Sequence, residues 1–431
     1  MTMFDSRLFL VLLAVLVPSL GSVPGPNELP DKLQNLLDLL VDAKADFQAL
    51  LGLSIIWTSV TGGPVDQHAT KETRALYHSM LKLARTPNKF MFGHQEDTWI
   101  GISPARGNYQ TAQVDNNDED ELSDIRSVTG EYPAIVGFDF KDFQDDQIKI
   151  LTYLVKKAHA RGQVITVCQH ASNPVTGGSF HLYWDNGTVL HTLRRSLPGG
   201  DANPKFKANL DKIASWANNM KDENGRLIPI IFRLFHEADG DWFWWGLNNR
   251  CQNTPTDIRD IMKYTISYLR DTGNVHNFLY TFTIDCFTKT DNFHLLYPGD
   301  DYIDIISVDY YYKYTPTTTK DILKTNIANL VDIAESRGKI PAIAEAGMAD
   351  DGLFNHTNAW TDNYLSVLKT QPKLTRILYI LGWHNRCLIN DYCPFYVPFK
   401  GFKGAAIFRD TFYKDPVTVF EKEIRSLKVY G

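Results

Sequence analysis

The sequence predicts a closed (β/α)8 barrel, the TIM-barrel fold, and three observations point to this fold class. Eight short apolar runs rich in β-branched residues recur between residues 89 and 385. Amphipathic segments with helical spacing separate them, and an alternation of strands and helices over such a length favours an α/β barrel. An open, doubly wound sheet usually carries a Gly-x-Gly-x-x-Gly turn after its first strand, and the first run here ends in FGHQEDTWIG instead.

The eight expected strands are apolar and short, and each is followed by polar or aromatic side chains. They are KFMFGHQ (89–95), PAIVGFDF (133–140), QVITVCQH (163–170), IPIIFRLFHE (228–237), NFLYTFTID (277–285), YIDIISVDYY (302–311), IPAIAEAG (340–347) and RILYILGWHN (376–385).

Amphipathic segments at 146–162, 257–273 and 325–338 predict helices between these strands. Two of them end in Arg-Gly and the third in Thr-Gly, and glycine is the residue that most often ends a helix before the next element.

Ahead of the barrel, residues 1–22 are typical of a secretory signal peptide, with an apolar run at 8–17 followed by small residues. Ten apolar residues are too few to span about 30 Å of hydrocarbon as a helix, so we expect cleavage, secretion to the extracellular space and no membrane attachment afterwards. Residues 23–62 form a lead-in with an amphipathic helix over 31–51, a short N-terminal helical extension, and residues 63–431 form one barrel domain.

The composition narrows the class of partner. A net charge of −6 and the lack of a basic stripe argue against nucleic acid and anionic membranes, and we expect a monomer. An oxidising compartment is consistent with a disulfide between Cys387 and Cys393, and Cys251 and Cys286 could form another. We expect Cys168 to be buried and free. Asn-x-Thr sequons at Asn186 and Asn355 are glycosylation sites if a eukaryote makes the protein.

Polar and aromatic residues gather where the predicted strands end, which in a parallel barrel is one rim and the usual place of an active site. Singly, each of them also fits a helix cap or a hydrogen-bonded scaffold. The candidates are His94, Asp139, His170, His236, Glu237, Asp285, Asp309, Tyr311, Glu345, Trp383 and His384.

Glu237 and Glu345 lie in otherwise apolar surroundings, where an unused carboxylate is costly. They end the fourth and seventh strands, which lie nearly opposite each other across an eight-stranded barrel. The carboxyl groups could then approach to about 5–6 Å, the separation of a retaining glycosidase. The tryptophan-rich stretch RLFHEADGDWFWWG (233–246), which contains Glu237, is suited to stacking against sugar rings.

Competing chemistries have weaker support. Gly240 rules out an H-E-x-x-H zinc motif, and neither a G-x-S-x-G elbow, a phosphate-binding loop nor a C-x-x-C pair is present. The histidines His94, His170 and His236 could meet as a metal site, but the carboxylate hypothesis already uses them. We therefore expect neither a metal nor a cofactor.

These motifs resemble those of glycoside hydrolase family 26, a β-mannanase family of retaining (β/α)8 enzymes. RLFHEADGDWFWWG resembles the family's acid/base motif and FGHQED its first-strand motif, while QHASNP, SVDYYY, IAEAG and LGWHN follow in the family's order. The resemblance covers about residues 71–425, and the stretch around Glu237 is its most specific part.

The resemblance implies a secreted endo-β-1,4-mannanase that cleaves mannan, glucomannan or galactomannan without a cofactor. Glu237 matches the acid/base and Glu345 the nucleophile. The residues that it assigns to the substrate site are His170, His236, Trp242, Asp309, Tyr311 and Trp383. We add His94 from the first-strand motif and Arg233, which alternation places on the face of Glu237, where it could hydrogen-bond a carboxylate below the acid/base.

Three departures from the family pattern leave alternatives open. Ala238-Asp239 stands where many members have Met or Leu followed by Asn, Tyr310 competes with Tyr311, and the helix at 31–51 is not part of the pattern. A β-1,3-xylanase or mixed-linkage β-glucanase would use the same catalytic pair, and an inactive carbohydrate-binding relative is a third alternative.

Overall fold

The computed structural model describes residues 62–102, 109–111, 122–141, 145–185, 190–248, 250–285, 287, 290–312, 319–349, 353, 356–385 and 395–431. Within it, residues 63–431 form one compact unit. The signal sequence, the helix expected at 31–51, the asparagines of both sequons and the Cys387–Cys393 pair lie outside the described residues. In the part of the chain that is described, no helix is long and apolar enough to cross a membrane.

Eight parallel strands close into a barrel, because β1 pairs with β4 on one side and with β10 on the other. The strands are β1 Phe90–Gln95, β4 Ile135–Asp139, β5 Val164–Cys168, β6 Ile230–Arg233, β7 Phe278–Ile284, β8 Ile305–Tyr312, β9 Ile340–Met348 and β10 Tyr379–Gly382. All eight expected strands are confirmed. Two strands are much shorter than expected: β6 ends at Arg233 rather than at Glu237, and β10 covers only 379–382 of the expected 376–385.

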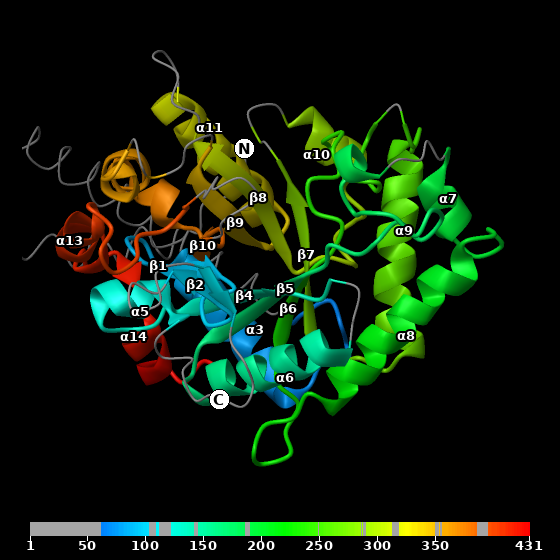
Figure 1. Ribbon diagram of the computed structural model, residues 1–431, viewed down its shortest axis with the longest axis horizontal. Helices are drawn as coiled ribbons and strands as arrows, with labels where there is room; N and C mark the ends of the chain where they lie inside the picture. Colours follow the sequence, from blue (N-terminus) through cyan, green and yellow to red (C-terminus); the bar gives the residue numbers. More distant parts are fainter. Residues whose placement is uncertain are drawn as a thin grey trace, which may run out of the picture. The chain divides into compact units, whose positions relative to one another are not determined.

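Helices surround this barrel in Figure 1, with α6, α8, α9 and α11 among the longest. The α-helices are α3 Lys71–Arg85, α5 Asp124–Thr129, α6 Asp145–Ala160, α7 Thr192–Ser196, α8 Asn203–Asn219, α9 Pro255–Ser267, α10 Asp291–Leu296, α11 Thr319–Ser336, α12 Ser366–Leu368, α13 Ala405–Ile407 and α14 Glu421–Ser426. The three expected helices correspond to α6, α9 and α11. Helix α9 begins with a reciprocal capping box between Thr254 and Asp257, which satisfies backbone groups that the helix leaves free.

Two smaller elements were not expected from the sequence. Strands β2 (Ile100–Ile102) and β3 (Tyr109–Thr111) form an antiparallel hairpin after β1, and β11 (Thr418–Val419) pairs in parallel with the first two residues of β1, Phe90 and Met91. Both are too short to produce a recognisable alternation of apolar residues.

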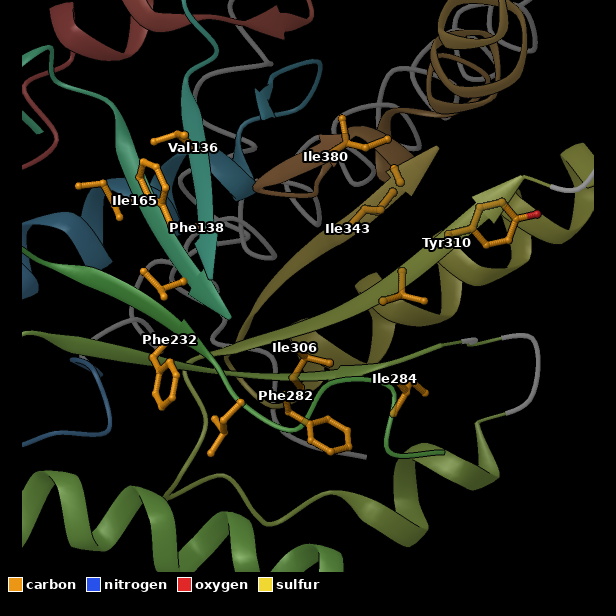
Figure 2. Packing of buried hydrophobic residues seen from close by; sticks show 14 of the residues in the cluster. Val136, Phe138, Ile165, Phe232, Phe282, Ile284, Ile306, Tyr310, Ile343 and Ile380 are labelled. Carbon is orange, nitrogen blue, oxygen red and sulfur yellow. The ribbon is translucent and has the colours of Figure 1, made fainter. Parts of the chain in front are cut away.

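Alternate residues of each strand face the helices and form the main hydrophobic layer. Phe92 packs against Trp360 and Phe412, and Phe282 packs against Phe293 of α10. Figure 2 shows this layer along neighbouring strands, with Phe138, Phe232 and Ile343 among its members. The residues between them face the barrel interior, where polar groups pair; the hydroxyls of Thr283 and Ser307, for example, are 2.7 Å apart.

Cys168 at the end of β5 is buried and free, as predicted, and Cys251 is free as well. The possible disulfide between Cys251 and Cys286 is therefore wrong. Cys286 itself lies outside the described residues.

Candidate active site

A β-bulge turns Glu345 toward the barrel interior. In the ladder between β8 and β9, Val308 pairs with Ile343 but Asp309 pairs with Glu345, so Ala344 is an extra residue on β9. Ile343 belongs to the outer hydrophobic layer, and strict alternation would have sent Glu345 to the same outer face. The bulge reverses the alternation, and Glu345 comes to lie directly beside Asp309.

Glu237 is positioned by an irregular turn rather than by a strand. β6 ends at Arg233, and both Phe235 and Glu237 have positive φ angles, 46° and 51°. Non-glycine residues adopt this left-handed conformation at a cost, and such residues are frequent at functional sites. The backbone N–H of Glu237 donates to the carbonyl of Thr283 on β7, which fixes the turn against the barrel.

Trp242 folds back over this turn and holds the carboxylate of Glu237. Its indole Nε1 donates to Oε2 of Glu237 at 2.6 Å. The indole ring also covers Gly240, because a Cβ atom added at that position would lie 2.4 Å from the ring. Glycine at residue 240 is therefore needed for the close approach of Trp242 to Glu237.

Arg233 and Tyr311 hold the carboxylate of Glu345. The guanidinium of Arg233 donates one N–H to Oε1 of Glu345 and another, at 2.7 Å, to Asp309. The hydroxyl of Tyr311 donates to Oε2 of Glu345 at 2.6 Å. Both carboxylate oxygens are thus held by hydrogen bonds from donors, one of them cationic, which fixes the orientation that a nucleophile requires.

Glu237, Asp309 and Glu345 each present a carboxylate oxygen, and these three atoms lie within 4.8 Å of one another. Burial, together with the charges of Asp309 and Glu345, raises the pKa of Glu237 well above its usual range, although Arg233 opposes the effect. One carboxyl that holds its proton beside one that is paired with a cation is the arrangement of a glycosidase acid and nucleophile.

Two histidines stand beside this pair. His170 donates from Nδ1 to Oδ2 of Asp139 at 2.9 Å, and its Nε2 lies 3.1 Å from Nε2 of His236. That same nitrogen of His236 lies 3.8 Å from Glu345. Burial lowers the pKa of His236 well below its usual value, and the charge of Arg233 lowers it further, so His236 is a neutral hydrogen-bonding group.

A cleft of about 520 Å³ contains this chemistry. It brings together seven of the ten residues that the sequence singled out for catalysis or substrate binding. They are His170, His236, Glu237, Trp242, Tyr311, Glu345 and Trp383.

Three of the ten, His94, Arg233 and Asp309, do not line the cleft. His94 is fully buried and pairs through Nδ1 with Asp97 at 2.6 Å. Arg233 and Asp309 lie beneath Glu345 and are also buried. The expected shared face of Arg233 and Glu237 does not exist either, because the strand ends at Arg233. Arg233 does bind carboxylates, as expected, but they are Glu345 and Asp309.

Trp244 and Trp245 are also buried, so the stretch after Glu237 is only partly a surface. Trp244 donates its indole N–H to the carbonyl of Ala171, and Trp245 donates to that of His236. Both tryptophans are therefore part of the loop core. They tie the turn that carries Glu237 to the barrel.

Glu96, Lys141 and Trp184 line the cleft as well, and the sequence did not single them out. Glu96 and Lys141 each follow a strand and have positive φ angles, 54° and 47°, and their charged ends are 3.4 Å apart. Trp184 ends a short 3-10 turn at Leu182–Trp184 and is 55% exposed. Glu96 and Lys141 could have been found in the sequence as charged residues one and two positions after the end of a strand.

A second cavity of about 360 Å³ lies on the other side of the turn, against α8, and Trp244, Trp245 and Phe206 contribute to its lining. Its lining contains no carboxylate and no histidine. It therefore lacks the groups for acid–base catalysis, and the chemistry belongs to the larger cleft.

Comparison with known proteins agrees with this geometry. A sequence model of glycosyl hydrolase family 26 matches residues 65–374. A mannan endo-1,4-beta-mannosidase of Bifidobacterium adolescentis is 29% identical over 371 residues, which are 80% of this chain and 34% of that protein. The chain thus spans about a third of that relative's length. A mannan endo-1,4-beta-mannosidase of Bacillus subtilis is 26% identical over 75% of this chain and 83% of its own.

Solved structures are similar as well. An endo-beta-1,4-mannanase double mutant of Cellulomonas fimi is 31% identical and superimposes with a TM-score of 0.72 over 84% of this chain and 78% of its own. The catalytic domain of an endo-beta-1,4-mannanase from Bacillus sp. JAMB-750 is 27% identical, with a TM-score of 0.73 over 86% of this chain and 96% of its own.

Proposed function

The chain belongs to glycosyl hydrolase family 26, and we propose that this glycoside hydrolase is a secreted, retaining endo-β-1,4-mannanase. Its substrates are mannan, glucomannan and galactomannan backbones, its acid/base is Glu237 and its nucleophile is Glu345. The observation that carries the mechanism is the pair of carboxylates in one cleft with oxygens within 4.8 Å, one with a raised pKa and one bound to Arg233. The mannanases among its relatives support the substrate.

In the first step, Glu345 attacks the anomeric carbon while Glu237 gives its proton to the departing glycosidic oxygen. Tyr311 and Arg233 hold Glu345 in one orientation, and each carboxylate oxygen keeps a lone pair for attack because it can accept two hydrogen bonds. In the second step, Glu237 removes a proton from water, and the water attacks the glycosyl-enzyme ester. The anomeric carbon is inverted twice, so its configuration is retained.

Aromatic rings on two sides of the cleft are suited to holding the sugar chain. Trp383 lies 6.0 Å from His170 between ring centres, and Trp184 presents an exposed indole at the edge of the cleft. Such rings bury the apolar faces of pyranoses and leave the hydroxyl groups free to bond polar neighbours.

We expect hydrolysis with retention of configuration at the anomeric carbon. Oxygens within 4.8 Å leave no room for the water that an inverting enzyme places between its carboxyls, whose separation is about 6.5–9.5 Å. Proton NMR of the first products of a β-mannan oligosaccharide should show the β-anomer before mutarotation. An initial α-anomer would contradict the double displacement.

We expect Trp242→Phe to move the basic limb of the pH profile of kcat/KM to higher pH. The indole N–H stabilises the ionised form of Glu237, so losing it raises the pKa of a group that must be protonated to act. The shift should be about one pH unit, since a hydrogen bond to a charged group contributes about 1.5 kcal/mol or more.

Trp244→Phe is the matched control, because that indole donates to the carbonyl of Ala171 instead. Its basic limb should stay in place even though the variant loses stability. Equal profiles for Trp242→Phe and the wild type would show that the hydrogen bond does not set the acidity of Glu237.

The substrate is tested with the purified protein on linear mannan, glucomannan, galactomannan, β-1,3-xylan and lichenan. We expect the highest kcat/KM on mannan-type chains, with oligosaccharides as early products. Preference for β-1,3-xylan or lichenan would favour the alternative enzymes on the same scaffold. Binding without hydrolysis would favour an inactive carbohydrate-binding relative. Signal cleavage is read from the N-terminal sequence of protein recovered from the culture medium.

A further inference from the structure

We propose that Asp139, Cys168 and His170 form a binding site for a thiophilic divalent cation, Zn²⁺ or Cd²⁺, and that occupation of this site stops hydrolysis. The second half of the proposal rests on the proposed function, because it concerns catalysis by Glu237 and Glu345. The first half concerns only the three side chains and can be tested without any substrate.

The backbone of two neighbouring strands brings the three ligands together. Asp139 ends β4 and pairs in register with Cys168, which ends β5. His170 follows Cys168 by two residues, the spacing that puts two side chains on one face of an extended chain. One donor atom from each residue lies within 4.8 Å of the other two.

The distances between the donor atoms suit a single ion. Nδ1 of His170 lies 2.9 Å from Oδ2 of Asp139 and 3.8 Å from Sγ of Cys168. Zinc bonds of about 2.3 Å to sulfur and about 2.0–2.1 Å to nitrogen or oxygen place tetrahedral ligands about 3.3–3.6 Å apart. The sulfur of Cys168 lies within 4.8 Å of a carboxylate oxygen of Asp139, so side-chain movements of about 1 Å would complete three corners and leave the fourth for water.

The chemistry of the donors selects the class of metal. A thiolate with an imidazole is a soft to borderline set, which prefers Zn²⁺ or Cd²⁺ over Mg²⁺ or Ca²⁺. The thiol of Cys168 has only weak present partners, the carbonyl of Phe138 at 3.5 Å and the amide of Gln95 at 3.8 Å. Neither would hold it back from a metal ion.

An ion can reach this site from the cleft. Asp139 and His170 line the cleft, and Cys168 lies directly behind them with its side chain buried. Metal binding displaces one proton from the thiol of Cys168 to solvent. It also displaces the proton on Nδ1 of His170, and the neutral ring then carries its proton on Nε2.

This change reverses the hydrogen bond between the two histidines. In the metal-free protein, Nδ1 of His170 donates to the carboxylate of Asp139. Nε2 of His170 then accepts from Nε2 of His236, whose N–H also lies near Glu345, at 3.8 Å. With metal bound, Nε2 of His170 becomes the donor, the proton of His236 moves from Nε2 to Nδ1, and Nε2 of His236 presents a lone pair to His170 and Glu345. The catalytic carboxylate loses a favourable neighbour, and the ion fills part of the cleft wall.

Cadmium titration tests the site directly. In thiol-free, chelator-free buffer, the folded protein should bind one equivalent of Cd²⁺ with an ultraviolet thiolate-to-metal charge-transfer band. Cys168→Ser should lose that band, and Cys251→Ser, which removes the second buried free cysteine among the described residues, should keep it. Circular dichroism establishes that both variants are folded. A band of equal strength in Cys168→Ser would overturn the site.

Inhibition is the second readout, with each variant normalised to its own rate in the absence of metal. Zn²⁺ should inhibit the wild type and Cys251→Ser alike, and the concentration for half inhibition should rise more than about tenfold in Cys168→Ser. Even the loss of a group that only supports a metal ligand costs 10–100-fold in affinity. Full activity with the cadmium band saturated would overturn the inhibitory role. A protein that binds cadmium through Cys168 but hydrolyses no polysaccharide would refute the proposed function and leave the metal site standing.

Discussion

Glu345→Ala is expected to lower kcat on mannan by on the order of 10⁴-fold or more, as the loss of a covalent nucleophile does in other enzymes. Glu345 carries this effect because it lies within 4.8 Å of the acid and is held by Arg233 and Tyr311. Alanine leaves a hole beside Arg233 that a small anion can enter. Azide should therefore restore turnover of an aryl β-mannobioside with a good leaving group.

The configuration of the azide product separates the two glutamates. In Glu345→Ala, azide replaces the nucleophile in a single displacement, so the glycosyl azide should be inverted. In Glu237→Ala, Glu345 still forms the ester and azide replaces water in the second step, so the glycosyl azide should be retained. NMR of the two products gives the assignment. Most of the wild-type turnover in Glu345→Ala, or exchanged configurations, would contradict it.

Arg233→Met is expected to lower the free energy of unfolding by about 3–5 kcal/mol, the cost of removing one partner from a buried ion pair. Arg233 is 3% exposed and donates to Asp309 and Glu345, so its loss leaves two carboxylates buried together. Urea unfolding followed by tryptophan fluorescence measures the difference. Arg195→Met is the matched control, because its pair with Asp201 is exposed to solvent and contributes little to stability.

The loss of unfolding free energy in Arg233→Met should depend on pH. Burial raises the pKa of Asp309 and Arg233 opposes this, so the variant's Asp309 has a still higher pKa. A group whose pKa is higher in the folded than in the unfolded state favours folding at low pH and loses that contribution as pH rises through the folded pKa. The deficit should thus be smallest near pH 4 and grow toward neutrality. A deficit no larger than that of Arg195→Met at pH 7 would contradict the role assigned to Arg233.

The barrel and most of its site follow from local sequence patterns. Apolar runs such as 163–170 and 340–347 are short and bounded by glycine or polar residues, and helical segments separate them. Because the carboxyl ends of parallel strands meet at one rim, His170, Glu237, Glu345 and Trp383 could be assigned to one cleft without coordinates. Local patterns do not determine where a strand ends, because alternation indicates which way side chains face but not where hydrogen bonding between strands stops.

The tertiary structure decided how these residues face one another. Ile343 and Glu345 are two residues apart, and alternation alone would place them on the same side of β9; only the bulge at Ala344 turns Glu345 inward. The bulge depends on the register with β8, which no local pattern contains.

The same holds for the groups around the two glutamates. Arg233 hydrogen-bonds Glu345 rather than Glu237, because β6 ends before the turn with positive φ angles begins. The tertiary structure also determines which tryptophans after Glu237 reach the cleft. Trp242 faces the cleft, while Trp244 and Trp245 are buried. Residue type and order along the chain determined which chemistry the rim carries. Contacts between distant strands determined which side chains touch, because hydrogen-bond partners and burial depend on residues far away in sequence.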